Sequence, residues 1–151
     1  MVPSGVCARV SRAITVLFVE DDADTRFAYQ LVATEEGMIV ETARNGDEGI
    51  ALAGVLLPDV IVLDIGLSSL EGLDGFEVAR RLRADPRTST IPIVFLSGYD
   101  GAHVLAMIRA SGCDGHLVKP SSVDALLGLI TELAMSRRDP ADGADAQVSI
   151  A

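Results

Sequence analysis

The alternation of short apolar runs with amphipathic stretches is the feature that most constrains this chain. Each run is rich in Val, Ile and Leu and too short for a helix, whereas the stretches between them repeat apolar residues at helical spacing. Regular alternation of strand and helix implies right-handed crossovers and a parallel sheet covered on both faces. We predict a doubly wound α/β domain with strands over 14–19, 38–42, 60–63, 93–96 and 115–118, and helices over 25–36, 46–55, 76–84, 102–110 and 123–135.

The first predicted helix carries one apolar stripe with the spacing i, i+1, i+4, i+5. We expect this stripe to face the sheet. Its members are Phe27, Ala28, Leu31 and Val32.

The chain of 151 residues has the length of one ordinary domain. Residues 1–12 contain Pro, Gly and Ser without a period, so we expect a flexible leader. The folded domain is predicted over 13–136. Asp, Ala, Gly and Pro dominate 137–151, which we interpret as a flexible acidic tail.

The charge balance limits the choice of partners. Acidic residues number 22 and basic residues 12, and the formal net charge of −10 disfavours direct binding to nucleic acid. We interpret Arg80, Arg81 and Arg83 as a solvated helix face, with a surface for a protein partner as the alternative. The 2 cysteines have no metal-ligand spacing. Two thiols in a chain that needs no disulfide favour a reduced, cytoplasmic setting. Apolar runs of about six residues are much shorter than the roughly 18 that a membrane span needs, so we expect no membrane contact.

Polar or charged side chains follow four of the predicted strands. In a parallel sheet the carboxyl ends of the strands meet at one edge, where such folds bind ligands. We therefore expect these side chains to converge on one rim. They are Glu20, Asp21 and Asp22 after the first strand, Asp64 after the third, Ser97 after the fourth and Lys119 after the fifth.

Clustered carboxylates resist joint ionisation unless a hard divalent cation compensates their charge. Mg²⁺ is the candidate, because it binds carboxylate oxygens and leaves positions for phosphate oxygens. A carboxylate can attack phosphorus to form an aspartyl-phosphate when a metal and a cation absorb the charge of the transferring group. We assign the nucleophile to Asp64, charge neutralisation to Lys119 and a hydrogen bond to the phosphoryl group to Ser97.

Five segments resemble the signature segments of response-regulator receiver domains, and the resemblance covers about residues 13–136. The segments are FVEDDADTR, VIVLDIGL, DGFEVARRLR, PIVFLSGYD and GHLVKP. The resemblance implies a flavodoxin-like (βα)5 fold and a single-domain response regulator of two-component signalling. It also implies that Asp64 is the phosphoacceptor, that Lys119 is the site lysine and that Ser97 is the switch hydroxyl.

The same resemblance implies a set of metal ligands. Asp21, Asp64 and the backbone carbonyl of Gly66 would hold Mg²⁺, with Glu20 acting directly or through water. Two features depart from the family pattern. The loop IGLSSLEGLDGFE after Asp64 is about three residues longer than usual. His116 occupies the position of the family's switch Tyr or Phe, and we expect it to be a strand residue at a surface face.

Partners are implied as well. A histidine kinase or phosphotransfer protein would donate the phosphoryl group, and the domain would catalyse only its own phosphorylation and dephosphorylation. The signal would reach an unidentified downstream protein through the face of the fourth helix, fifth strand and fifth helix. We expect a monomer or a weak dimer.

Three other functions are compatible with parts of this sequence pattern. A phosphatase of the haloacid-dehalogenase type needs a second Asp two residues after the nucleophile, where this chain has Gly66. A flavin or nucleotide binder needs a phosphate-cradling Gly-rich loop, which does not follow Asp64. A receiver-like interaction module that does not depend on phosphorylation is the main alternative. Taken singly, Asp21 or Asp22 would serve as a helix N-cap and Lys119 as a surface lysine.

Overall fold

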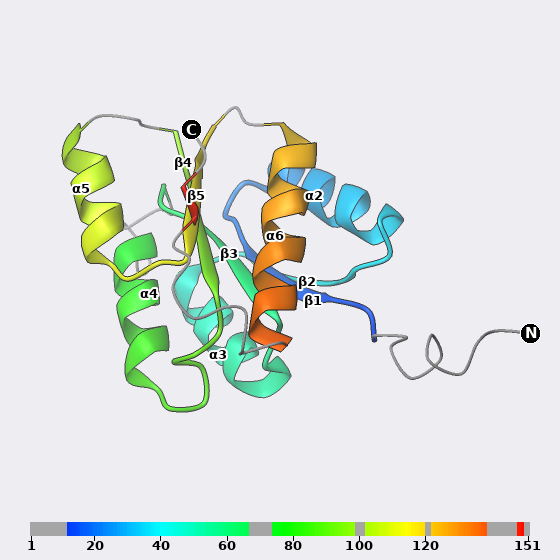
Figure 1. Ribbon diagram of the computed structural model, residues 1–151, viewed down its shortest axis with the longest axis horizontal. Helices are drawn as coiled ribbons and strands as arrows, with labels where there is room; N and C mark the ends of the chain where they lie inside the picture. The colour runs from blue at the N-terminus through cyan, green and yellow to red at the C-terminus, as the bar shows by residue number, and fades with distance from the viewer. Residues whose placement is uncertain (1–11, 67–73, 99–101, 120–121, 139–147, 150–151) are drawn as a thin grey trace, which may run out of the picture.

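The sheet is the centre of the molecule (Figure 1), a computed structural model that describes residues 12–66, 74–98, 102–119, 122–138 and 148–149. In this part of the chain the sheet has six parallel strands in the order β2-β1-β3-β4-β5-β6. The strands are β1 Thr15–Val19, β2 Ile39–Ala43, β3 Val60–Asp64, β4 Ile93–Ser97, β5 Gly115–Val118 and β6 Val148–Ser149. The helices are α2 Ala23–Glu35, α3 Gly46–Leu56, α4 Gly75–Ala84, α5 Ala102–Ala110 and α6 Val123–Arg138. The doubly wound α/β prediction is confirmed.

Two apolar cores lie on opposite faces of the sheet. Alternate residues of the central strands point to alternate faces, so Ile61 and Leu63 join the core under α3, α4 and α5, while Val60 and Val62 join the core under α2 and α6. Figure 1 shows the same division of the helices into two layers. Every residue of β3 is buried, which explains why its sequence is a continuous apolar run rather than an alternating one.

The buried face of α2 differs from the predicted stripe. Phe27 and Leu31 are 65% and 50% exposed, whereas Ala33 is fully buried. Tyr29 is half-buried and stacks on Phe18 of β1 with ring centroids 5.4 Å apart. The prediction was wrong because it chose the most apolar stripe. The sheet under α2 is already filled by bulky strand residues, so a small alanine and one ring suffice to cover it.

The region after residue 136 also differs from the prediction. Helix α6 continues through Arg138, and Val148 and Ser149 form a sixth strand that pairs in parallel with Gly115 and His116 of β5. The rest of the predicted tail and nearly all of the predicted leader lie outside the described residues, as does most of the loop after Asp64. None of the described helices is both long and apolar enough to span a membrane.

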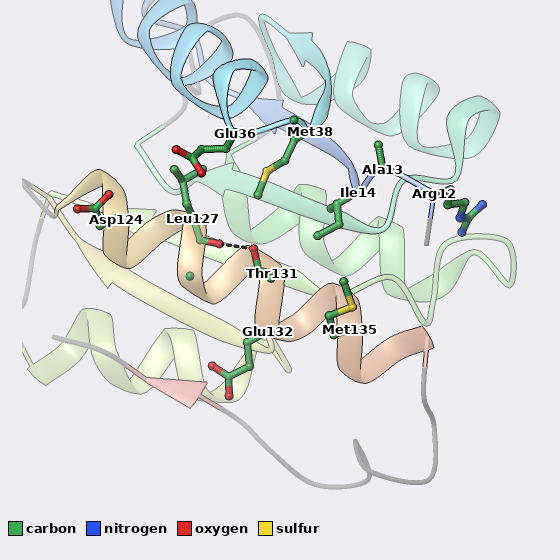
Figure 2. Close-up of a pocket in the computed structure, with 12 residues that line it drawn as sticks. Arg12, Ala13, Ile14, Glu36, Met38, Asp124, Leu127, Thr131, Glu132 and Met135 are labelled. Atoms are coloured by element: carbon green, nitrogen blue, oxygen red, sulfur yellow. Dashed lines mark hydrogen bonds between the residues drawn. The ribbon is translucent and has the colours of Figure 1, made fainter. Parts of the chain in front are cut away.

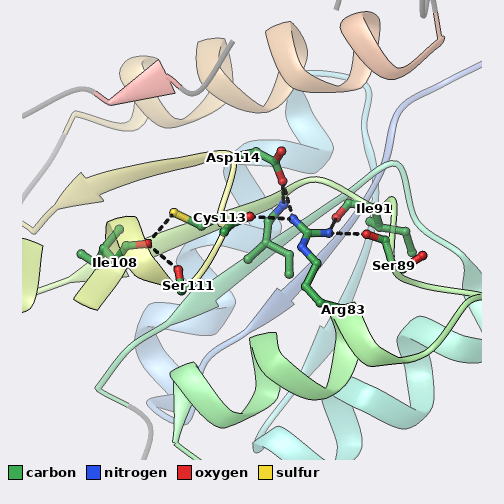
Figure 3. Close-up of polar contacts among 9 residues, drawn as sticks. Arg83, Ser89, Ile91, Ile108, Ser111, Cys113 and Asp114 are labelled. Atoms are coloured by element: carbon green, nitrogen blue, oxygen red, sulfur yellow. Dashed lines mark hydrogen bonds and ion pairs between the residues drawn. The ribbon is translucent and has the colours of Figure 1, made fainter. Parts of the chain in front are cut away.

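Arg83 is not part of a solvated helix face, although Arg80 and Arg81 are exposed as predicted. Figure 3 shows its guanidinium reaching past the end of α4 to the starts of β4 and β5. It donates to the carbonyl oxygen of Ile91 at 2.7 Å and to Asp114 Oδ2 at 2.6 Å. The same Asp114 oxygen accepts the backbone N–H of Ile93 at 2.9 Å. The Arg83 side chain therefore links residues that precede β4 and β5.

Replacing Arg83 by lysine tests this role. Arg83→Lys keeps the charge but loses the planar fork, so one or more buried acceptors lose their donor, and we expect the free energy of unfolding to fall by about 1–3 kcal/mol. Arg81→Lys is the matched control on the same helix, and its exposed pairing with Glu77 predicts a change within about 0.5 kcal/mol. Urea denaturation measures both variants, and equal losses would contradict the role.

Candidate functional site

Four strands deliver the predicted polar residues to one edge of the sheet. The register places Val19 beside Leu63, so the residues that follow β1 lie beside the end of β3. Asp64 pairs with Leu96, and Ser97 with Val118, which brings the ends of β4 and β5 to the same level. The rim expected from the sequence is therefore present.

Lys119 joins two carboxylates at this rim. Its Nζ lies 3.3 Å from Glu20 Oε2 and 3.3 Å from Asp64 Oδ2. The side chains of Glu20 and Asp64 are 4% and 8% exposed, against 28% for Lys119. The other oxygen of Asp64, Oδ1, accepts the backbone N–H of Gly66 at 2.9 Å. Asp64 is thus held at both oxygens at the base of a partly open site.

Three carboxylates form a group that could hold a metal ion. Oxygens of Glu20, Asp21 and Asp64 lie within 4.8 Å of one another, and Asp21 is exposed while the other two are buried. An oxygen-only donor set of this charge fits a hard divalent cation such as Mg²⁺. The structure also places Gly66 next to Asp64 through its N–H; a ligand role for its carbonyl stays a prediction.

Burial and the neighbouring Asp64 raise the pKa of Glu20 to about 7, although Lys119 acts in the opposite direction. For Lys119, burial alone would lower the pKa, but the charges of Asp64 and Glu20 outweigh this effect and raise it. The site therefore holds more negative charge than its single lysine balances. A divalent cation would relieve this excess, which supports the fit of the acidic group to Mg²⁺.

The structure separates the roles of Asp21 and Asp22. Asp22 is the N-cap of α2, and its carboxylate accepts the backbone N–H of Thr25 at 2.9 Å. Hydrogen bonds from the Thr25 hydroxyl and N–H lower the pKa of Asp22. Asp21 instead belongs to the acidic group. Sequence reasoning did not find Arg26, whose Nη1 donates to the carbonyl oxygen of Glu20 at 2.9 Å and anchors the turn that carries the acids.

The two predicted switch residues are both buried. Ser97 is 1% exposed, and its carbonyl oxygen accepts the backbone N–H of Lys119 at 2.6 Å. His116 is a strand residue as predicted, but at 6% exposed it does not lie at a surface face. Burial, and to a smaller extent the charge of Arg109, lowers the pKa of His116, which favours the neutral ring. Leu117 belongs to the core under α6, so His116 points to the opposite, α5 side of the sheet.

A groove with a volume of about 670 Å³ lies between α6, the turn from α2 to β2 and the start of β1. Figure 2 shows the residues that line it. Ile14, Met38, Leu127 and Met135 give it an apolar lining. Neither Asp64 nor any other member of the acidic group lines it. The groove is therefore separate from the site at the strand ends.

Gly75, the first residue of α4, packs directly on the backbone that carries Asp64. A Cβ at this position would lie 2.8 Å from the carbonyl oxygen of Asp64 and 2.8 Å from Cα of Ile65. These atoms belong to the main chain and cannot rotate away. The DGFEV segment thus needs glycine so that α4 can approach the end of β3.

Substitution of Gly75 tests this close approach. We expect Gly75→Ala to lower the free energy of unfolding by about 1–3 kcal/mol, because the backbone at Asp64 must shift to admit the methyl group. Gly128→Ala is the control within α6, where nothing lies within 4 Å of the added Cβ. There the higher helix propensity of alanine should stabilise the chain by up to about 1 kcal/mol. Urea denaturation would contradict the packing argument if Gly75→Ala were as stable as the wild type.

The raised pKa of Glu20 predicts a pH-dependent stability. Between pH 4.5 and about 7 the folded chain binds more protons at Glu20 than the unfolded chain, so this group makes stability fall as pH rises through that window. In metal-free buffer at pH 8, Glu20→Gln should therefore stabilise the chain, by at most about 3 kcal/mol. The gain should shrink at pH 5, where Glu20 in the folded chain is protonated. Thermal unfolding with a chelator measures both, with Glu132→Gln at an exposed position of α6 as control; a gain independent of pH would contradict the assignment.

The response regulator receiver domain family matches residues 16–131. The transcriptional regulatory protein AfsQ1 of Streptomyces coelicolor is 40% identical over 106 residues, which make up 70% of this chain and 44% of AfsQ1. The chain thus spans less than half of that relative. Protein PilH of Pseudomonas aeruginosa is 31% identical over 115 residues, which make up 76% of this chain and 93% of PilH.

A solved structure supports the same assignment. The chemotaxis response regulator CheY4 of Vibrio cholerae superposes with a TM-score of 0.73 at 28% sequence identity, and the match covers 81% of this chain and 99% of CheY4. The family match extends from β1 into α6 and so includes every strand end that forms the acidic site. The chain belongs to the response regulator receiver domain family.

Proposed function

We propose that this domain accepts a phosphoryl group on Asp64 from a histidine kinase or a phosphotransfer protein. The observation that carries the proposal is the contact of Lys119 with both Asp64 and Glu20, beside an acidic group suited to a divalent cation. Receiver domains are phosphoacceptor signalling domains, and the contacts among Lys119, Asp64 and Glu20 support such a role for this one. Mg²⁺ is the proposed cofactor, held by Asp21 and Asp64, by Glu20 directly or through water, and by the Gly66 carbonyl.

The chemistry assigns a task to each side chain. A carboxylate oxygen of Asp64 attacks the phosphorus of a phosphohistidine, the phosphorus–nitrogen bond breaks, and the histidine of the donor leaves with the electron pair and takes up a proton. When bound, Mg²⁺ supplies positive charge for the phosphoryl oxygens. Lys119, already 3.3 Å from Asp64 Oδ2, supplies a second positive charge and a hydrogen bond. The N–H of Gly66 keeps Oδ1 in place while the other oxygen reacts.

Ser97 links phosphorylation to the rest of the domain in this proposal. Its hydroxyl would donate to a phosphoryl oxygen and draw the end of β4 towards Asp64. Its carbonyl oxygen already accepts the N–H of Lys119, so β4 and β5 move together. The aspartyl-phosphate then shifts a pre-existing equilibrium between two conformations, with buried His116 in the place of the usual aromatic switch.

The output is a change of protein contacts. We propose that the face formed by α5, β5 and α6 transmits the signal to a separate downstream protein, and that the domain works in the cytoplasm as a monomer or weak dimer. PilH, which this chain covers over 93% of its length, supports a regulator of this size. Dephosphorylation by the domain itself, with water as the attacking group, belongs to the same proposal.

Phosphoryl incorporation tests the proposal. Incubation with acetyl phosphate should add one phosphoryl group in the presence of Mg²⁺, as read by intact mass, and none with a chelator. Asp64→Asn should abolish the addition, because an amide oxygen is a poor nucleophile. Asp22→Asn is the matched control, since asparagine caps helices as well as aspartate does and Asp22 lies outside the acidic group.

The outcome separates two functions. Unchanged incorporation in Asp64→Asn would show that another residue is the acceptor. No incorporation in a wild-type chain with a cooperative unfolding transition would favour the receiver-like interaction module that works without phosphorylation.

A further inference from the structure

The outer edge of β5 is occupied by a distant part of the same chain. Val148 and Ser149 pair in parallel with Gly115 and His116, and Figure 1 shows this short strand beside β5. Without it, β5 would end the described sheet on this side, since the strand order runs β4-β5-β6. A parallel bridge uses one N–H from each strand, so β6 satisfies backbone groups that β5 would otherwise present unpaired.

An unpaired strand edge is a binding surface for an extended peptide. Backbone hydrogen bonds provide affinity for any segment that can adopt the β conformation, and side chains provide selectivity. The segment around β6 has the right composition, because Val148 and Ile150 alternate with a polar residue after a stretch rich in Asp, Ala and Gly. The β-branched pair is the sequence signal that distinguishes this segment from the acidic stretch before it.

The contact is too small to be permanent. Its register holds two pairs of residues, and the net stabilisation by one or two backbone hydrogen bonds is modest. The chain has nine residues between the end of α6 and the start of β6, so the segment is covalently tethered and its effective concentration at β5 is raised. A tethered occupant of this kind pairs readily and is also readily displaced by a competing strand.

We propose that the outer edge of β5 is a strand-addition site for an extended peptide that binds in parallel, and that the Val148–Ser149 segment occupies it in cis. A protein that docks on this edge must then displace the segment. The site lies within the face that the proposed function uses for output, so its part in signalling rests on that function. Occupancy of the edge does not, because it depends only on the two strands.

Amide hydrogen exchange in the full chain tests the occupancy. In the double variant Val148→Pro/Ser149→Pro neither residue can donate an N–H to β5, whichever of the two does so in the wild type. We expect amides among Gly115, His116 and Leu117 to exchange at least about tenfold faster, with amides of β1 and β3 unchanged. Ala141→Pro/Ala144→Pro is the matched control with two prolines between α6 and β6, and it should leave β5 protected. Equal protection of β5 in wild type and variant would overturn the proposal.

A peptide added in trans tests the site itself. The peptide ADAQVSIA, which copies residues 144–151, should shift the β5 amide signals of the Val148→Pro/Ser149→Pro chain saturably and restore their protection. It should bind the wild-type chain at least about tenfold more weakly, because the tethered copy competes. A scrambled peptide controls for composition. No shift at millimolar peptide, or equal affinity for both chains, would overturn the proposal.

Both experiments use no Mg²⁺ and no phosphoryl donor. Failure of Asp64 to accept a phosphoryl group therefore leaves their result intact. Conversely, a failure of strand addition leaves the phosphoacceptor assignment unaffected.

Discussion

One ammonium group stands between two buried carboxylates, and the geometry of the site depends on it. Lys119 comes from the end of β5, Asp64 from the end of β3 and Glu20 from the residue after β1, so its two contacts join three strands. Like charges this close would repel and open the rim if the lysine were absent. Because Lys119 remains partly exposed, it can still move when another anion enters. The pairing thus holds the site together without closing it.

The rest of the fold offsets the cost of this charge excess. Glu20 is held with its pKa raised to about 7, which means that its ionised form is disfavoured where it sits. The two cores compensate, since β3 and β4 are buried over their full lengths between helices on both faces. Arg83 fixes the entries to β4 and β5 at the end of the sheet remote from the acids. The strand ends can therefore carry an excess of negative charge, because burial of the strands stabilises the sheet to which they belong.

The sequence predicted the structure correctly where only one arrangement of the residues is physically favourable. Strands buried on both faces must be continuously apolar, and parallel strands must end at one edge, so the positions of Asp64, Ser97 and Lys119 followed from the pattern. The hydrophobic pattern failed where more than one face of a helix could bury a similar apolar surface area against the sheet. It could not tell that Ala33 rather than Leu31 faces the sheet, because that depends on the space left by Phe18 and its neighbours. The pattern alone also left open whether Asp21 or Asp22 caps the first helix; the structure places Asp22 at the N-cap and Asp21 in the acidic group.

Two further features could not be predicted from the sequence, because they depend on contacts between residues that are far apart in the chain. Arg83 looks like any helix arginine until Asp114 is brought within 2.6 Å of it by the fold. The strand at Val148–Ser149 is too short to rise above a loop in any periodicity. Each is specified by a partner more than thirty residues away, and a local pattern contains no information on such partners.

Strand β5 is the element through which the site can influence a surface. Lys119 follows β5 directly, and its N–H donates to Ser97 at 2.6 Å, so a displacement of the lysine acts on the main chain of both strands. β5 has only four residues, and His116 in its middle pairs with Ser149 of β6. In a longer strand, a small displacement at one end would be distributed over many backbone hydrogen bonds, and the other end would stay in place. With a strand this short, Lys119, which contacts the acids, lies three and four positions from His116 and Gly115, which pair with β6, so a movement at one end reaches the other.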